Sequence, residues 1–398
     1  MDKILEKSAI LIKNQENRFV RSLMEKIDWS DRLIGILGAR GTGKTTLLLQ
    51  RQKQEYGLTQ KAVYLTLDDI YFTENRLVDF ANAFYQQGGK ALFIDEVHKY
   101  PGWAQEIKNI YDFNKELRIV FTGSSITDML RQHADLSRRA VQYELPGLSY
   151  REYLQFISVN TTSVISLPEL IKNHYEIALD LSAKFKPLQY LQSYWQSGYY
   201  PFFTENVNTY AIRLEQVVKL IIENDLRFIE GFDQANTRKI YQLLYVLATN
   251  VPFKPNVTKL SAKIGVHRNT LVQYLYYLEK ARLVNALTAS GKSTSTLQKP
   301  DKIYLENTNL HFVFSPEQAN TGTLRESFFL NQLRNAGHNI SLPLKTDFHV
   351  DEKYFFEVGG KDKKISQLDK NKFSYVVSDD IEVGALNKIP LWLFGFLY

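Results

Sequence analysis

The sequence predicts an α/β protein that begins with a parallel sheet and continues into helical and mixed parts. Three observations predict this architecture. Short apolar runs alternate with amphipathic stretches up to about residue 145, one run leads through a glycine-rich turn into a helix, and another run ends in two acidic residues. The chain has 398 residues, of which 44% are hydrophobic and 23% charged. This length and composition favour a folded chain of roughly two to four domains.

Five short apolar runs are the predicted strands of the first sheet. They cover residues 33–37, 62–67, 91–94, 118–122 and 141–145. Because the stretches that separate them have helical content, we expect the strands to run parallel. From about residue 150 to 250 the pattern is mostly helical, and residues 250–254 (NVPFK) interrupt it. The polar segment 289–300, rich in Gly, Ser and Thr, is expected to be a hairpin tip or a linker.

The turn after the first strand carries a phosphate-binding motif. Residues 38–45 read GARGTGKT and match G-x-x-x-x-G-K-[ST], between an apolar strand and a helix start. The glycines let backbone N–H groups face the phosphates, and the helix N-terminus adds its positive end. We expect Lys44 to hold the β- and γ-phosphates and Thr45 to place its hydroxyl on Mg²⁺. The predicted nucleotide-binding residues are Gly38, Ala39, Arg40, Gly41, Thr42, Gly43, Lys44, Thr45 and Thr46.

The third predicted strand ends in two acidic residues, in the sequence LFIDE (92–96). Asp95 at the strand tip is expected to hold Mg²⁺ through water, and Glu96 to polarise the attacking water. Two acids at the end of a strand are common, and the alternative to a magnesium and water site is a strand end that is simply exposed to solvent. Paired with the phosphate loop, it favours hydrolysis of ATP with Mg²⁺ over binding alone.

Two further sites near this sheet leave alternatives open. Thr122 or Ser124, at the end of the fourth strand, could orient the attacking water, or could simply cap the strand. Arg138 and Arg139 precede the fifth strand. Either arginine could reach the γ-phosphate of a neighbouring subunit and act catalytically there, or could form a surface salt bridge.

A helix-turn-helix pattern occupies residues 257–280, with Gly265 in the turn. In the second helix Leu271, Tyr274, Leu275 and Leu278 share one apolar face. The opposite face, including Tyr277, offers nucleic-acid candidates at Arg268, Asn269, Gln273 and Lys280. Residues 238–302 hold eleven Lys and Arg against two acids, a local charge of +9, whereas the whole chain carries +6. Double-stranded DNA is therefore one candidate partner, and packing against the nucleotide domain is the alternative.

These motifs together resemble prokaryotic AAA-type P-loop ATPases that carry a restriction-endonuclease-like C-terminal domain of uncharacterised type. The matching pieces are GARGTGKT, LFIDEVHKYPGWAQEIKNIYD, IVFTGSS, RRAVQYELPGLSYREYL and YWQSGYYPFF. The resemblance implies an AAA-like core (1–148), a helical lid (149–235), a winged helix-turn-helix (236–300) and the C-terminal domain (301–398). By position, Arg139 matches the arginine that the family carries before its fifth strand.

The C-terminal domain is expected to keep the nuclease fold without its activity. Residues 346–350 and 353–358 are two predicted short strands that form a hairpin through Asp351 and Glu352. Nucleases of this fold place an acid on one strand and E-x-K on the next to hold Mg²⁺. The corresponding positions are Glu326, Asp347 and Glu357, but Gly359 stands where the lysine is required. Lys361 could substitute only if the strand end curls back.

The cysteine and histidine content and the lack of long apolar runs exclude several classes of site. No cysteine is present, which excludes thiolate metal sites and cysteine nucleophiles, and the seven histidines lack metal-ligand spacing. No signal peptide or membrane-spanning run is seen, and residues 391–398 (LWLFGFLY) are short enough to be a buried strand, so we expect a cytoplasmic protein without a membrane partner. The first hypothesis is an Mg²⁺-dependent ATPase whose nucleotide state moves the winged-helix and C-terminal module, with DNA a candidate partner. The alternatives are a slow ATP-dependent switch that binds a protein partner without nucleic acid, and an ATP-regulated nuclease. A homo-oligomer or a protein partner is a further candidate assembly.

Overall fold

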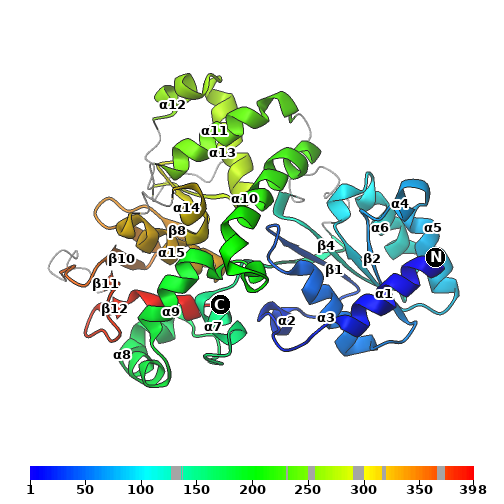
Figure 1. Ribbon diagram of the computed structural model, residues 1–398, viewed down its shortest axis with the longest axis horizontal. Helices are drawn as coiled ribbons and strands as arrows, with labels where there is room; N and C mark the ends of the chain where they lie inside the picture. Colours follow the sequence, from blue (N-terminus) through cyan, green and yellow to red (C-terminus); the bar gives the residue numbers. More distant parts are fainter. Residues whose placement is uncertain are drawn as a thin grey trace. The chain divides into compact units, whose positions relative to one another are not determined.

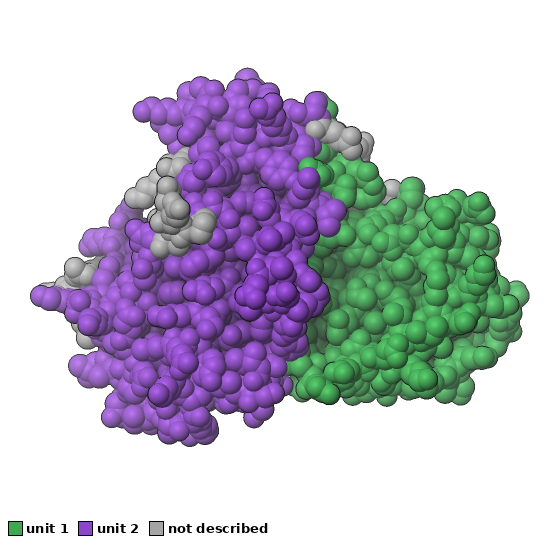
Figure 2. All heavy atoms as spheres, viewed as in Figure 1, with its two compact units in different colours: residues 1–146, 223–233 green, residues 147–222, 234–398 purple. Residues whose placement is uncertain are grey.

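The protein divides into two compact units in a computed structural model. The structure describes residues 1–126, 136, 138–229, 232–249, 256–289, 300–315, 320–364 and 373–398. Unit 1 comprises Met1–Pro146 and Glu223–Asp233, and unit 2 comprises Gly147–Ile222 and Gln234–Tyr398 (Figure 2). The grouping differs from the four expected segments, because a piece of the predicted lid folds with the first unit.

The sheet of unit 1 consists of the five predicted strands. They are β1 (Leu33–Gly38), β2 (Ala62–Thr66), β3 (Ala91–Asp95), β4 (Arg118–Ser124) and β5 (Val141–Glu144). Their order is β2-β3-β4-β1-β5, and every neighbouring pair is parallel. The prediction of a parallel α/β sheet is therefore confirmed. Because all strands point the same way, their carboxyl ends meet at one edge, where ligands bind in such folds.

Helices cover both faces of this sheet (Figure 1). Leu33 and Leu37 of β1 point into a core shared with α5 and α6, whereas Ile34 and Ile36 point into a second core shared with α3. This alternation follows from the two-residue period of a strand, and burial on both faces explains why the strands read as continuous apolar runs. The helices of unit 1 are α1 (Asp2–Asn14), α2 (Leu23–Lys26), α3 (Lys44–Tyr56), α4 (Tyr71–Glu74), α5 (Leu77–Gln86) and α6 (Trp103–Phe113).

Unit 2 begins with the helical stretch that the sequence predicts. Its first helix opens with a capping box, in which the Ser149 side chain accepts from the Glu152 backbone N–H and the Glu152 side chain accepts from the Ser149 backbone. The helices here are α7 (Tyr150–Phe156), α8 (Leu167–Lys184), α9 (Pro187–Ser193), α10 (Tyr210–Leu220) and α11 (Thr237–Ala248). The predicted break at 250–254 lies outside the described residues.

The two helices of the predicted helix-turn-helix form as α12 (Val257–Ile264) and α13 (Arg268–Lys280). Gly265 joins them with φ of 71°, a left-handed conformation that suits glycine. The predicted apolar face of α13 is buried. Tyr277, expected on the open face, is only 4% exposed, so that assignment was wrong. A two-stranded antiparallel sheet follows, β6 (Val284–Leu287) with β7 (Lys302–Leu305), and residues 290–299 between them lie outside the described part.

The C-terminal part of unit 2 is a mixed sheet beside two helices, α14 (Thr308–Phe314) and α15 (Thr321–Asn335). The strand order is β12-β11-β10-β9-β8. The predicted hairpin at its centre is confirmed, with Asp351 and Glu352 at positive φ in the turn between antiparallel β9 and β10. The strands are β8 (Ile340–Ser341), β9 (Phe348–Val350), β10 (Tyr354–Gly359), β11 (Ser374–Ser378) and β12 (Lys388–Pro390).

The last apolar run is helical and not a strand. Leu391–Phe396 forms a buried 3₁₀ helix after β12. The expectation of a strand failed because six consecutive buried side chains fit either structure, and periodicity cannot separate them. Within the described residues, no helix combines the length and apolar character needed to cross a membrane.

Candidate functional site

The phosphate loop joins β1 to α3 at the carboxyl edge of the first sheet. Gly41 and Gly43 adopt φ of 83° and 95°, which favours glycine at both positions. Gly38 is required for another reason, since a Cβ there would lie 2.4 Å from the Leu145 carbonyl oxygen. The Thr42 hydroxyl donates to the Ala39 carbonyl at 2.9 Å, which helps hold the loop closed. The loop predicted from the motif therefore has the strand–loop–helix setting that the motif requires.

Lys44 lies inside this loop and is 6% exposed. Its Nζ donates to the carbonyl oxygens of Gly38 and Ala39, both at 2.9 Å. Burial lowers the pKa of Lys44, and the nearby Glu96 and Asp95 carboxylates oppose that effect. A buried ammonium in such a loop has a strong preference for an anionic ligand, because its desolvation is then offset.

Asp95 and Thr45, the two predicted Mg²⁺ ligands, are in direct contact. The Thr45 hydroxyl donates to Asp95 Oδ2 at 2.6 Å, and the Tyr64 hydroxyl donates to the same oxygen at 2.9 Å. Thr122 donates to Asp95 Oδ1. Carboxylate and hydroxyl oxygens are the ligands that Mg²⁺ prefers, so these residues fit the ion with ATP. Thr122 thus contacts Asp95, the predicted metal ligand, and helps to hold its carboxylate in place.

Glu96 differs from Asp95, because its Oε2 makes no hydrogen bond in the described part of the chain although two nitrogen donors lie within 4 Å. Its backbone takes φ of 55° at the start of a 3₁₀ turn, Val97–Lys99, which turns the side chain away from the strand direction. Glu96 Oε2 lies 3.4 Å from Lys99 Nζ and 3.7 Å from His98 Nε2. Among the described residues, this oxygen accepts no hydrogen bond although it is buried. The hydrogen-bonding capacity of this oxygen is therefore unused within the described residues.

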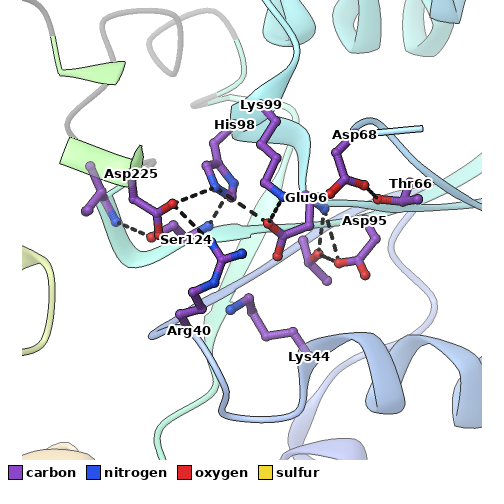
Figure 3. Close-up of polar contacts among 12 residues, drawn as sticks. Arg40, Lys44, Thr66, Asp68, Asp95, Glu96, His98, Lys99, Ser124 and Asp225 are labelled. Carbon is purple, nitrogen blue, oxygen red and sulfur yellow. Dashed lines mark hydrogen bonds and ion pairs between the residues drawn. The ribbon is translucent and has the colours of Figure 1, made fainter. Parts of the chain in front are cut away.

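Sequence reasoning missed two residues of this site, His98 and Asp225 (Figure 3). The Ser124 backbone N–H donates to His98 Nδ1 at 3.3 Å, so Nε2 of the neutral ring carries the proton. His98 Nε2 lies between Glu96 and Asp225, 3.9 Å from Asp225 Oδ1. Asp225 Oδ1 also pairs with Arg40 Nη1 at 3.1 Å. The Ser124 hydroxyl accepts from Ile126 N at 3.5 Å, which is the capping alternative.

Arg139 forms the salt bridge that was the alternative to a catalytic role. Its Nε and Nη2 bond the two carboxylate oxygens of Asp112 at 2.9 and 3.0 Å. Asp112 lies on α6 and Arg139 is half-buried. Any action of Arg139 on a neighbouring subunit would first have to break this bidentate pair. Arg138 beside it is exposed.

The nucleic-acid candidates lie on α13 in unit 2. Arg268, Asn269 and Gln273 are exposed, and Gln273 bonds the Tyr277 hydroxyl. Lys280 is half-buried and lies 5.8 Å from the Tyr276 ring centroid. The local charge is partly neutralised, because Lys302 pairs with Glu326 at 2.7 Å. Arg268 is therefore the most accessible cation of the four candidates.

Of the predicted nuclease positions, Asp347 and Glu357 lie close together, and Glu326 and Glu357 each pair with a lysine. Glu326 on α15 accepts from Lys302 and from the Tyr304 hydroxyl, the latter at 2.5 Å, and Asp347 Oδ2 accepts from the Val358 backbone N–H at 2.9 Å. Burial first, and then the Glu357 charge, raise the pKa of Asp347 against that hydrogen bond.

The lysine of this cluster is Lys363 and not Lys361. Lys361 is exposed, whereas Lys363 Nζ pairs with Glu357 at 2.7 Å. The Lys363 side chain packs over Gly359, where a Cβ would lie 2.9 Å from its Cδ. The condition set for Lys361 is therefore not met, because the chain returns to Glu357 two residues later, at Lys363. In the described ranges, no three His, Asp or Glu side chains are grouped as metal ligands.

Comparison with known proteins agrees with the first unit's geometry. Residues 30–154 match the family described as an AAA domain, and residues 188–311 match a domain of unknown function (DUF8612). An uncharacterised protein of Methanocaldococcus jannaschii, MJ1637, is 28% identical over 307 residues, which cover 71% of this chain. The chain spans 63% of that relative's length. The parallel sheet, the phosphate loop and the match to the AAA domain family together support a P-loop NTPase fold and ATP binding.

Two solved structures illustrate how far the similarity extends. AMPPCP-bound DnaA from Aquifex aeolicus is 16% identical, with a TM-score of 0.27 over 65% of this chain and 84% of that chain. C. elegans PCH-2 is 20% identical, with a TM-score of 0.24 over 44% of this chain and 48% of that chain. Scores this low carry no argument about function.

Proposed function

We propose that the protein binds ATP with Mg²⁺ in the phosphate loop of unit 1 and hydrolyses it. The observation that carries the proposal is the direct contact between Thr45 and Asp95, 2.6 Å apart, beside a buried lysine in the same loop. These elements are distant in the sequence and meet at the carboxyl edge of the sheet. A glycine-rich turn without a nucleotide role would not need them together.

Each residue has a separate task in this proposal. Lys44 exchanges the carbonyl oxygens of Gly38 and Ala39 for phosphate oxygens. Thr45 and Asp95 hold Mg²⁺, which neutralises phosphate charge when bound. Glu96 accepts a hydrogen bond from the attacking water through its free oxygen, and so orients it toward the phosphate. Tyr64 and Thr122 fix the Asp95 carboxylate and leave Glu96 as the base.

Nucleotide binding tests the first half of the proposal. Titration with a fluorescent ATP analogue should give saturable binding to the wild type and none to Lys44→Ala. Lys90→Ala is a matched control, since Lys90 is an exposed lysine of the same unit that pairs with Glu116 at 2.8 Å, before the start of β3 and away from the loop. Equal binding by Lys44→Ala and Lys90→Ala would contradict the assignment of the site.

The proposal extends to a moving module and a partner. Nucleotide state would shift the helices of unit 2, including the α12–α13 pair and the β6–β7 sheet, which we interpret as a winged helix. The exposed Arg268, Asn269 and Gln273 on α13 support duplex DNA as the partner. A slow switch that binds a protein, or its own copies through Arg139, is the competing proposal. Strong stimulation of ATP turnover by duplex DNA favours the first, and unchanged turnover favours the second.

Cleavage of nucleic acid is not part of the proposed function. Glu326 and Glu357 are each neutralised by a lysine of the same unit, at 2.7 Å in both cases. Cleavage of duplex DNA with Mg²⁺ that disappears in both Asp347→Ala and Glu357→Ala would restore the nuclease hypothesis.

A further inference from the structure

Residues 223–229 reach the phosphate loop from a distant part of the sequence. They belong to the stretch 223–233, which is grouped with unit 1 although the residues before and after it belong to unit 2. Helix α10 widens at its end into a π-helical turn, Ile221–Asp225, and then tightens into a 3₁₀ turn, Leu226–Phe228. Irregular turns of this kind are frequent at functional sites. The Phe228 ring packs edge-on against the His98 ring, with centroids 5.9 Å apart.

The polar contact of this segment is the ion pair between Asp225 and Arg40. Asp225 is 2% exposed, and its Oδ1 lies 3.1 Å from Arg40 Nη1. Arg40 is the third residue of the phosphate loop itself. The second carboxylate oxygen, Oδ2, is buried and has no hydrogen-bond partner in the part of the chain that is described. Asp225 is thus a buried anion whose main compensating charge is a residue of the nucleotide loop.

Arg40 and Lys44 are the two cations of the phosphate loop, and Asp225 already pairs with Arg40. A γ-phosphate brings further negative charge to Lys44. Because like charges in a buried site repel strongly, Asp225 and the γ-phosphate cannot both be well compensated by Arg40 and Lys44.

We propose that the Arg40–Asp225 ion pair discriminates ATP from ADP, because the γ-phosphate competes with Asp225 for Arg40. This inference rests on the proposed nucleotide function. ADP leaves the pair intact and residues 223–229 in place. ATP takes Arg40, leaves Asp225 without its cation and releases the segment, whose flanking residues continue into α10 and α11 of unit 2. Asp225 is therefore a specificity-determining residue and takes no part in the chemical step.

The test is the affinity of full-length Asp225→Asn for a non-hydrolysable ATP analogue and for ADP, both with Mg²⁺. We expect the affinity for the ATP analogue to rise about tenfold, as when a buried repulsive charge is removed, and the affinity for ADP to change less than about threefold. Glu106→Gln is the matched control and should change neither, because Glu106 is a buried carboxylate of unit 1 that pairs with Arg76 at 3.2 Å.

A second variant and a second readout separate the outcomes. Arg40→Gln should lower the affinity for the ATP analogue more than that for ADP, and adding Asp225→Asn should recover part of the loss. Amide exchange in residues 223–229 should rise with the ATP analogue and not with ADP. If Asp225→Asn leaves the ratio of ATP to ADP affinity unchanged, the γ-phosphate does not compete with Asp225 for Arg40, and the proposed ATPase function still stands. Absence of nucleotide binding in the wild type would overturn the proposed function as well.

Discussion

Asp95 and Glu96 are adjacent acids with different environments, and this difference supports the separate roles that we propose for them. Asp95 is 2% exposed and receives hydroxyl hydrogen bonds from Thr45, Tyr64 and Thr122. Glu96 keeps a buried oxygen without a hydrogen bond within the described residues. A carboxylate held by several hydroxyl donors is fixed in position and suits a cation, whereas one with a free oxygen can accept a hydrogen bond from water.

His311 in α14 predicts a pH dependence of stability. It is 2% exposed, and burial lowers its pKa to about 3, below the ordinary 6.5. Above pH 6.5 the ring is neutral in both folded and unfolded chains. As pH falls toward 3, only the unfolded chain takes up the proton, so the unfolding free energy should fall by up to about 1.4 kcal/mol per pH unit.

Urea unfolding between pH 7 and 4 measures this slope in the wild type and in His311→Gln. The variant should lose stability with falling pH less steeply than the wild type, whatever its stability at pH 7. Equal slopes for the two proteins would show that His311 is not held neutral by the fold.

At the scale of elements, the junction of β1 with the phosphate loop has no room for a side chain. A Cβ at Gly38 would lie 2.4 Å from the backbone oxygen of Leu145, an atom that cannot rotate away. Gly38→Ala should therefore cost about 1–3 kcal/mol of stability and weaken ATP binding, because the strand must shift. Thermal unfolding and nucleotide titration check both effects. Gly322→Ala is the control, since its nearest neighbour is the Asn320 side chain at 3.1 Å, and a similar loss there would remove the steric explanation.

Helix α13 carries the prediction about nucleic acid. If its exposed face contacts phosphates, Arg268→Ala should weaken duplex DNA binding equally across sequences and reduce the slope of log affinity against log salt by about 1. Lys184→Ala on α8 removes an equal charge from the same unit, at a lysine paired with Asp180 at 2.7 Å, and should leave the slope unchanged. If Arg268→Ala and Lys184→Ala give the same slope of log affinity against log salt, any contact with DNA lies outside the exposed face of α13.

At the scale of the whole molecule, the sequence predicts those elements whose formation depends on residues that are close together in the chain. The five strands, the phosphate loop, the α12–α13 pair and the β9–β10 hairpin all depend on neighbouring residues, and each was predicted. The 3₁₀ helix Leu391–Phe396 was not, because a short buried run lacks a distinguishing period.

The missed site residues share a different cause. Asp225 meets Arg40 across 185 positions, and no motif marks it. Lys363 replaces the expected Lys361 because the path of the chain after β10 decides which lysine returns to Glu357. His98 was visible two residues after Glu96, but a single histidine gives no sign that a Ser124 backbone N–H fixes its ring. Contacts between distant segments are set by packing, which composition and spacing do not report.

The central claim is that unit 1 hydrolyses ATP with Glu96 orienting the attacking water, and turnover by Glu96→Gln tests it most directly. The substitution keeps the size of the side chain and removes its charge. Release of phosphate by the wild type with Mg²⁺ should fall by about 10²-fold or more in the variant, as expected for loss of a catalytic base, while affinity for the ATP analogue stays within about threefold. Phosphate release at the wild-type rate by Glu96→Gln would contradict the account.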